Sequence, residues 1–128
     1  MRKILSVVAC LAGLLAAVDG YSHHSFSAEF DVGRPVNLAG TLKSAEWTNP
    51  HTWLHMEVTD NQGKIQLWAM ELLGSTALAR NSMHSRTVKP GDKLTVIGYR
   101  ARNGTNTANA SSVIRTDTGD VLWKSGAN

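Results

Sequence analysis

The chain has 128 residues, of which 42% are apolar and 18% are charged, and its formal net charge is +3. This length accommodates one domain of ordinary size, and the apolar fraction excludes an intrinsically disordered chain. The single cysteine, Cys10, lies in an N-terminal apolar run. Disulfide bonds and thiolate chemistry are therefore excluded once that run is removed.

The first 22 residues are typical of a cleaved secretory signal peptide. A basic start, Met1–Lys3, precedes an uncharged, mostly apolar stretch at 4–18 that is too short to span a bilayer. The small residues Gly20 and Ser22 predict cleavage after residue 22, with cleavage after residue 20 or a retained membrane anchor as alternatives. We therefore expect a periplasmic mature chain, residues 23–128, without membrane contact. Its net charge of +2 is too small to predict nucleic-acid binding.

Short strands and turns follow one another along the mature chain. Residues 23–35 contain Gly and Pro and predict an arm without regular structure. A short helix, Thr76–Arg80 capped by Ser75, is expected between the third strand and the fourth. This order favours an OB-like β-barrel of five to six strands over residues 36–128, with a small β-sandwich as the alternative. The predicted strands are Val36–Trp47, Trp53–Thr59, Lys64–Glu71, Lys93–Arg102, Ala108–Arg115 and a short one around Leu122 and Trp123.

Four of the five histidines form a candidate metal site. If cleavage follows Ser22, the α-amine and imidazole of His23, together with His24, form a chelate that suits Cu(II). His51 and His55 share one face of the second strand, and an arm folded over that face would complete the site. We therefore predict copper binding by His23, His24, His51 and His55 for carriage or buffering. The alternative is that the histidine pair is simply solvated.

Two tryptophans form a second candidate site. If the hairpin pairs Thr59 with Lys64, Trp53 and Trp68 lie together on the outer face and form a surface on which a small ring or a sugar can stack. A one-residue slip at Gly63 would turn Trp68 inward instead. The polar loop after the fourth strand adds further side chains to this surface. The predicted ligand-binding residues are Trp53, Trp68, Arg100 and Asn103.

No enzymatic motif is recognisable in the sequence. It contains no Gly-rich phosphate loop, HExxH, CxxC or GxSxG pattern. We therefore expect a non-enzymatic binding protein, and an enzyme with an open copper position is the catalytic alternative. The expected partners are a metal ion or a small molecule, with another periplasmic protein as a further alternative.

Three motifs carry a resemblance to a known family. They are HHSF at residues 23–26, WTNPHTW at 47–53 and KPGD at 89–92. The chain resembles an uncharacterised family of small exported bacterial proteins, a domain of unknown function, over nearly the whole mature sequence. The resemblance implies a small exported β domain from a Gram-negative bacterium. It implies no substrate and no activity.

Overall fold

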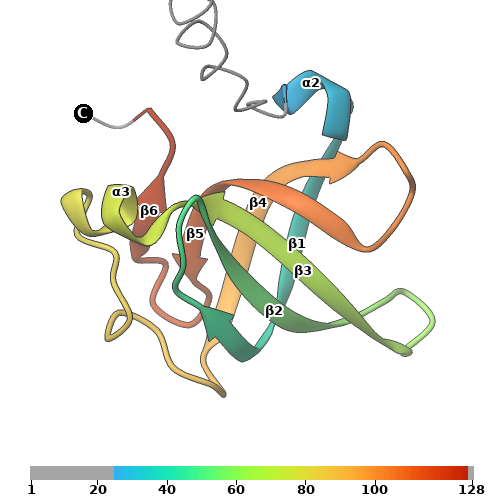
Figure 1. Cartoon of the computed structure of the whole chain (residues 1–128). Helices are drawn as coiled ribbons and strands as arrows, with labels where there is room; N and C mark the ends of the chain where they lie inside the picture. Colours follow the sequence, from blue (N-terminus) through green and yellow to red (C-terminus); the bar gives the residue numbers. More distant parts are fainter. Residues whose placement is uncertain (1–24, 127–128) are drawn as a thin grey trace, which may run out of the picture.

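The computed structural model describes residues 25–126. Antiparallel pairings join the strands in the order β3-β2-β1-β4-β5-β6, and a parallel pairing of β3 with β5 closes the sheet into a barrel-like ring (Figure 1). This confirms the predicted all-β class, although residues 25–126 contain two short helices where one was predicted. No helix in the described part of the chain is long and apolar enough to cross a membrane. The elements are α2 (Phe26–Glu29), β1 (Phe30–Glu46), β2 (His51–Thr59), β3 (Ile65–Leu73), α3 (Ser75–Arg80), β4 (Lys93–Ala101), β5 (Thr107–Arg115) and β6 (Val121–Lys124).

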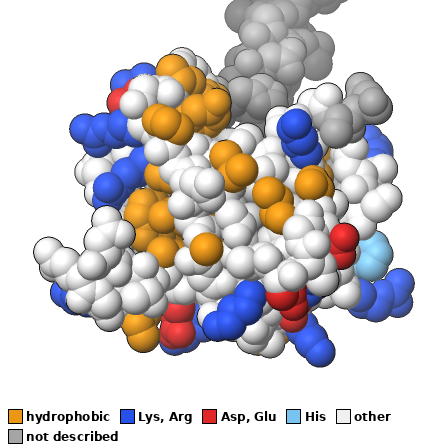
Figure 2. Space-filling view, turned by 180° about the vertical axis from the view of Figure 1, so that it is seen from behind, with side chains coloured by type: hydrophobic (Ala, Val, Ile, Leu, Met, Phe, Trp, Pro, Cys, Tyr) orange, Lys and Arg blue, Asp and Glu red, His pale blue; other side chains and the backbone are white. Residues whose placement is uncertain are grey.

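The N-terminal arm has more structure than the sequence predicts. Within the segment 23–35, α2 forms one helical turn and β1 already begins at Phe30. Phe26 stacks on Phe30 with ring centroids 5.6 Å apart and meets Tyr99 of β4 edge-on at 5.9 Å. Figure 2 shows hydrophobic side chains gathered at this end of the molecule. The register shift between Phe30 and Pro35 breaks the alternation that marks a strand, so the sequence pattern misses this part of β1.

The β2–β3 hairpin turns Trp68 into the core. Trp68 pairs with Met56 and is 8% exposed, so the prediction that it shares the outer face with Trp53 is wrong. The slip considered as the alternative is the register that the structure has. Gly63 adopts a φ of 78° and its N–H donates to the Asp60 carbonyl, which produces a turn ending in a bulge. That bulge shifts the returning strand by one residue.

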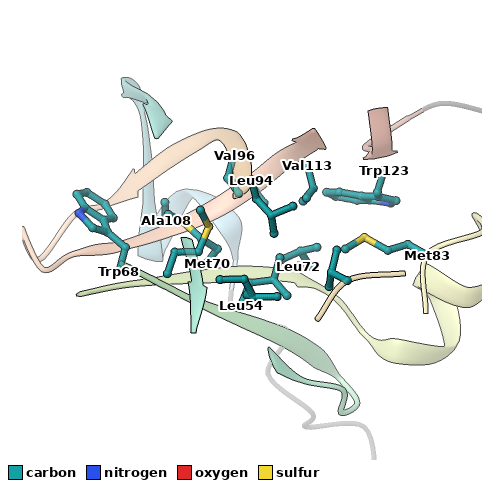
Figure 3. Packing of buried hydrophobic residues seen from close by; sticks show 14 of the residues in the cluster. Leu54, Trp68, Met70, Leu72, Met83, Leu94, Val96, Ala108, Val113 and Trp123 are labelled. Carbon is teal, nitrogen blue, oxygen red and sulfur yellow. The ribbon is translucent and has the colours of Figure 1, made fainter. Parts of the chain in front are cut away.

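One cluster of buried side chains fills the ring. Trp68 lies at one end of this core, and Trp123 and Met83 lie at the opposite end (Figure 3). The alternation predicted for β2 is confirmed, because every second residue from Thr52 to Val58 is buried. The most deeply buried apolar side chains are Leu42, Leu54, Met56, Met70, Leu72, Leu78, Met83, Leu94, Val96 and Val113.

The turn between β1 and β2 is bonded to α3. The Asn49 side chain accepts the Thr76 N–H at 3.3 Å and donates to Thr76 Oγ1 at 3.1 Å, and the Ser75 N–H donates to the Thr48 carbonyl at 3.0 Å. Ser75 is therefore the first helical residue and not the predicted cap, because the turn satisfies the free N–H groups instead. Gly74 allows this close approach, since a Cβ there would overlap the Asn49 side chain.

Candidate functional site

A cleft of about 550 Å³ lies on the outer face of the ring, beside α2. We call it the outer cleft. One wall comes from α2 and the start of β1, a second from β2 and β3, and a third from the end of β4, the loop that follows it and the start of β5. The mix of aromatic, charged and amide side chains is typical of a binding site. The described residues that line it are Ala28, Glu29, Phe30, Trp53, Glu71, Ala101, Arg102, Asn103, Thr105 and Thr107.

Strand register brings the polar and aromatic walls together. Trp53 and Glu71 are cross-strand partners, so their side chains share one face of the hairpin. Glu71 is in turn aligned with Asn109 of β5, whose amide donates to Glu71 Oε1 at 3.3 Å. Glu71 is 7% exposed. The outer cleft therefore contains a buried carboxylate beside an indole.

Two contacts attach α2 to the rest of the outer cleft. The Arg102 Nε donates to the Ser27 carbonyl at 2.7 Å, and the Arg102 N–H donates to the Glu29 carbonyl at 2.8 Å. The Arg102 guanidinium also lies 3.8 Å from the Asp31 carboxylate. Together with the aromatic contacts of Phe26, these bonds hold the wall formed by α2 against β4.

The two described histidines of the predicted metal site lie apart. His51 Nδ1 is 3.4 Å from Glu71 Oε1 and 3.3 Å from the Leu72 carbonyl oxygen, whereas His55 Nε2 is 2.9 Å from Glu46 Oε1. Four residues along a strand place their Cα atoms about 13 Å apart, and different carboxylates hold the two rings. Within residues 25–126 no group of three or more His, Cys, Asp or Glu side chains could hold a metal ion.

The other two predicted copper ligands, His23 and His24, lie outside the described residues. The chain that follows them, α2, lines the outer cleft together with Trp53. The N-terminal segment and Trp53, which lies on the face of β2 that carries His51, thus line the same cleft. Copper binding itself stays a prediction.

Trp68 and Arg100 meet at another cleft, of about 530 Å³. The Arg100 guanidinium carbon is 5.1 Å from the centroid of the Trp68 ring, which is a cation–π contact. The same guanidinium donates to the carbonyls of Thr105 and Gly104 at 3.1 and 2.8 Å and to Asn106 Oδ1 at 3.0 Å. Arg100 therefore holds the β4–β5 loop against the core.

The Asp60 carboxylate stands at the rim of this second cleft. Hydrogen bonds from the Lys64 N–H, the Gln66 side chain and the Gln62 N–H lower the pKa of Asp60 below its ordinary value, although partial burial opposes them. The carboxylate thus accepts hydrogen bonds from the backbone of the β2–β3 turn. This is the turn that sets the register of Trp68.

The four predicted ligand-binding residues divide between the two clefts. Trp53 and Asn103 line the outer cleft, whereas Trp68 and Arg100 line the second one. Sequence reasoning missed Glu71, because the expected hairpin register gave its strand the opposite orientation. The available signal was a single carboxylate inside the apolar run of β3.

Comparison with known proteins identifies a family but no function. The model of a family of unknown function, DUF6152, matches residues 11–110. No curated protein matches the chain. A chain from the crystal structure of a complex of TiaS with a transfer RNA and ATP is similar with a TM-score of 0.47 and 18% identity, over 64% of this chain and 18% of that chain. A likeness this weak carries no argument about function.

Proposed function

This chain belongs to the DUF6152 family of unknown function, and we propose that it is an exported, non-enzymatic protein that binds a small molecule in the outer cleft. The observation that supports this is that Trp53 and the buried Glu71, which are register partners in β2 and β3, both line the outer cleft. The volume of the outer cleft, about 550 Å³, falls within the range of about 300–1,000 Å³ that is common for ligand pockets. Asn103 and the threonines of the β4–β5 loop add neutral hydrogen-bonding groups.

Export to the periplasm is part of the proposal and follows from the predicted signal peptide, residues 1–22. Mass spectrometry of the protein recovered from the periplasmic fraction is expected to give a chain that begins at His23. Recovery of a chain beginning at Met1 in the cytoplasm or the membrane would contradict export with cleavage.

NMR titration of the exported protein tests the binding site. Small polar molecules of neutral, anionic and cationic type are added in turn, and shift changes are expected at the Trp53 indole N–H and at the amides of Asn103, Thr105 and Thr107. Trp53→Ala is expected to abolish these changes. Leu67→Ala, an exposed residue that does not line the outer cleft, is the matched control. If no molecule of any type perturbs the outer cleft, the proposed function is wrong.

Copper binding is the second candidate, with another periplasmic protein as a further candidate partner. The observation that favours copper is that α2, which begins two residues after His24, lines the outer cleft together with Trp53, two residues from His51. The α-amine of a mature N-terminal histidine and several imidazoles are good Cu(II) ligands. His55 would have to leave the Glu46 carboxylate to join this site.

A competitive Cu(II) titration followed by electron paramagnetic resonance tests this candidate. The protein must be free of tags, with His23 confirmed as its first residue, because an extension would abolish the α-amine chelate. We expect submicromolar affinity and a spectrum with several nitrogen ligands, and weaker binding by His51→Ala. His84→Ala is the control, since the hydrogen bonds of His84 to other residues in the range 25–126 stay within its own loop. Weak binding by the protein with a free His23 would refute copper.

A further inference from the structure

We infer that the second cleft, which Trp68 and Arg100 line, binds a neutral polyhydroxylated molecule of the saccharide class. This site is separate from the outer cleft, because the described residues that line the two clefts have no member in common. Three features support the inference: the preformed walls of the second cleft, the balance of its charges and its unpaired neutral groups. None of these features depends on the function proposed for the outer cleft.

The second cleft lies between two hairpins and one strand. Residues 58–61, 66 and 68 of the β2–β3 hairpin form one wall, Arg100 and Asn106 of the β4–β5 hairpin form another, and residues 37–39 of β1 complete the lining. Both hairpins project from the same side of the ring (Figure 1). The volume of about 530 Å³ falls within the range of about 300–1,000 Å³ that is common for ligand pockets.

A chain of hydrogen bonds connects the two hairpins. The Arg100 guanidinium donates to Asn106 Oδ1 at 3.0 Å, and the Asn106 amide donates to Gln66 Oε1 at 3.3 Å. The Gln66 amide in turn donates to Asp60 Oδ2 at 3.2 Å. These bonds hold the walls of the second cleft in place before a ligand arrives, which lowers the entropy that binding costs.

The charges of the second cleft are balanced. Asp60 and Arg100 are the charged side chains among the described residues that line it, one of each sign. Asp60 accepts hydrogen bonds from N–H groups of its own turn, and Arg100 donates to backbone carbonyls of the β4–β5 loop. A charged ligand would be attracted by one of the two side chains and repelled by the other. The lining therefore favours a neutral polar ligand over an anion or a cation.

The hydrogen-bonding groups that remain unpaired in the second cleft are neutral. Within residues 25–126 the side chains of Asn37, Thr59 and Asn61 make no hydrogen bond. An amide presents a donor beside an acceptor, and each sugar hydroxyl likewise donates and accepts, so the two can satisfy each other. Leu38 and Ala39 add apolar surface that suits the C–H groups of a sugar ring.

NMR titration with neutral and charged sugars tests the inference. The methyl glycosides of glucose, galactose and mannose are the neutral probes, and each is added at millimolar concentration to the exported protein. We expect at least one of them to shift the side-chain amide signals of Asn37, Asn61 and Gln66. The uronate and the 2-amino sugar related to that probe carry a negative and a positive charge on the same ring. Both are expected to bind no more tightly than the neutral glycoside.

Two variants assign the binding to named side chains. Asn37→Ala and Asn61→Ala each remove a neutral hydrogen-bonding group, so each is expected to weaken binding about two- to tenfold. Both residues are exposed and their side chains make no hydrogen bond within residues 25–126, so the fold is expected to be retained. Gln62→Ala is the matched control, because it removes an exposed amide from the same turn as Asn61 and does not line the second cleft.

The outcomes for the two clefts can be told apart, because different residues report on each. If no neutral glycoside shifts the signals of Asn37, Asn61 and Gln66, the saccharide inference is wrong. If the glycosides shift only Trp53 and Asn103, the inference is wrong and the proposed function of the outer cleft is supported. Tighter binding of the uronate or of the amino sugar would overturn the argument from charge balance. Equal weakening by Asn61→Ala and Gln62→Ala would overturn the role of Asn61.

Discussion

Replacing Thr52 by valine is expected to stabilise the protein. Thr52 lies in β2 between two residues of the candidate sites and is 0% exposed. Its hydroxyl oxygen has no hydrogen-bond partner within residues 25–126. A buried polar group without a partner loses its hydrogen bonds to water on folding, and no hydrogen bond within the protein replaces them. Valine has nearly the same shape and replaces the hydroxyl by a methyl group.

The size of the effect follows from that lost hydration. A buried polar group left without a partner costs about 1–3 kcal/mol, so Thr52→Val is expected to raise the free energy of unfolding by about that amount. For a domain of this size each 1 kcal/mol raises the melting temperature by about 4–8 °C. Urea unfolding followed by tryptophan fluorescence measures the free energy, and calorimetry measures the melting temperature.

Thr48→Val is the matched control for this experiment. The Thr48 hydroxyl donates to the His51 carbonyl at 2.7 Å, so the same chemical change is expected to destabilise the protein by about 0.5–1.5 kcal/mol. If the free energy of unfolding rises for Thr52→Val and falls for Thr48→Val, the difference comes from the hydrogen bonding of the hydroxyl group, because both substitutions change the side-chain size equally. If Thr52→Val lowers the melting temperature, the hydroxyl of Thr52 has a favourable partner and the reasoning is refuted.

Three further predictions concern the elements around the clefts. Gly74→Ala is expected to lower the free energy of unfolding by about 1–3 kcal/mol in urea, because its Cβ would overlap the β1–β2 turn; an unchanged midpoint would contradict that packing. Phe26→Ala is expected to speed amide hydrogen exchange in α2 but not in the core, since only the docking of α2 depends on that ring. Burial alone raises the pKa of the Asp92 carboxyl, but the Lys89 N–H and the Arg115 guanidinium outweigh it and hold the pKa below its ordinary value. Asp92 therefore stabilises the fold above the ordinary carboxyl pKa of about 3.9, and this contribution is lost as the pH falls through the lower folded value. Urea unfolding of Asp92→Asn should show a smaller loss of stability in acid, and an unaltered pH dependence would count against this role.

Sequence periodicity was sufficient for the parts of the fold that depend on neighbouring residues. The alternation of Leu54, Met56 and Val58 with outward residues predicted β2 correctly, and the spacing of the strands predicted a closed all-β sheet. These features need only the two-residue period of a strand. They locate Trp53 on the outer face without any knowledge of its partners.

The features that were missed depend on backbone geometry and on distant contacts. Whether the hairpin bulges at Gly63 decides which way Trp68 and Glu71 point, and the alternation pattern is compatible with both registers. The docking of α2 depends on Phe26 meeting Tyr99, which is far away in sequence. The outer cleft could not be predicted, because it needs both features at once.

The parallel pairing of β3 with β5 makes the outer cleft sensitive to opening of the ring. This seam comprises three residue pairs, Ala69–Thr107, Met70–Ala108 and Glu71–Asn109, fewer than any other pairing around the ring. Two residues that line the outer cleft, Glu71 and Thr107, stand on opposite sides of the seam. A molecule that contacts both side chains would hold β3 and β5 together, because the two strands could not separate at these pairs while the molecule stays bound to both. Hydrogen exchange of the backbone amides along this seam is therefore expected to slow when a molecule is bound in the outer cleft.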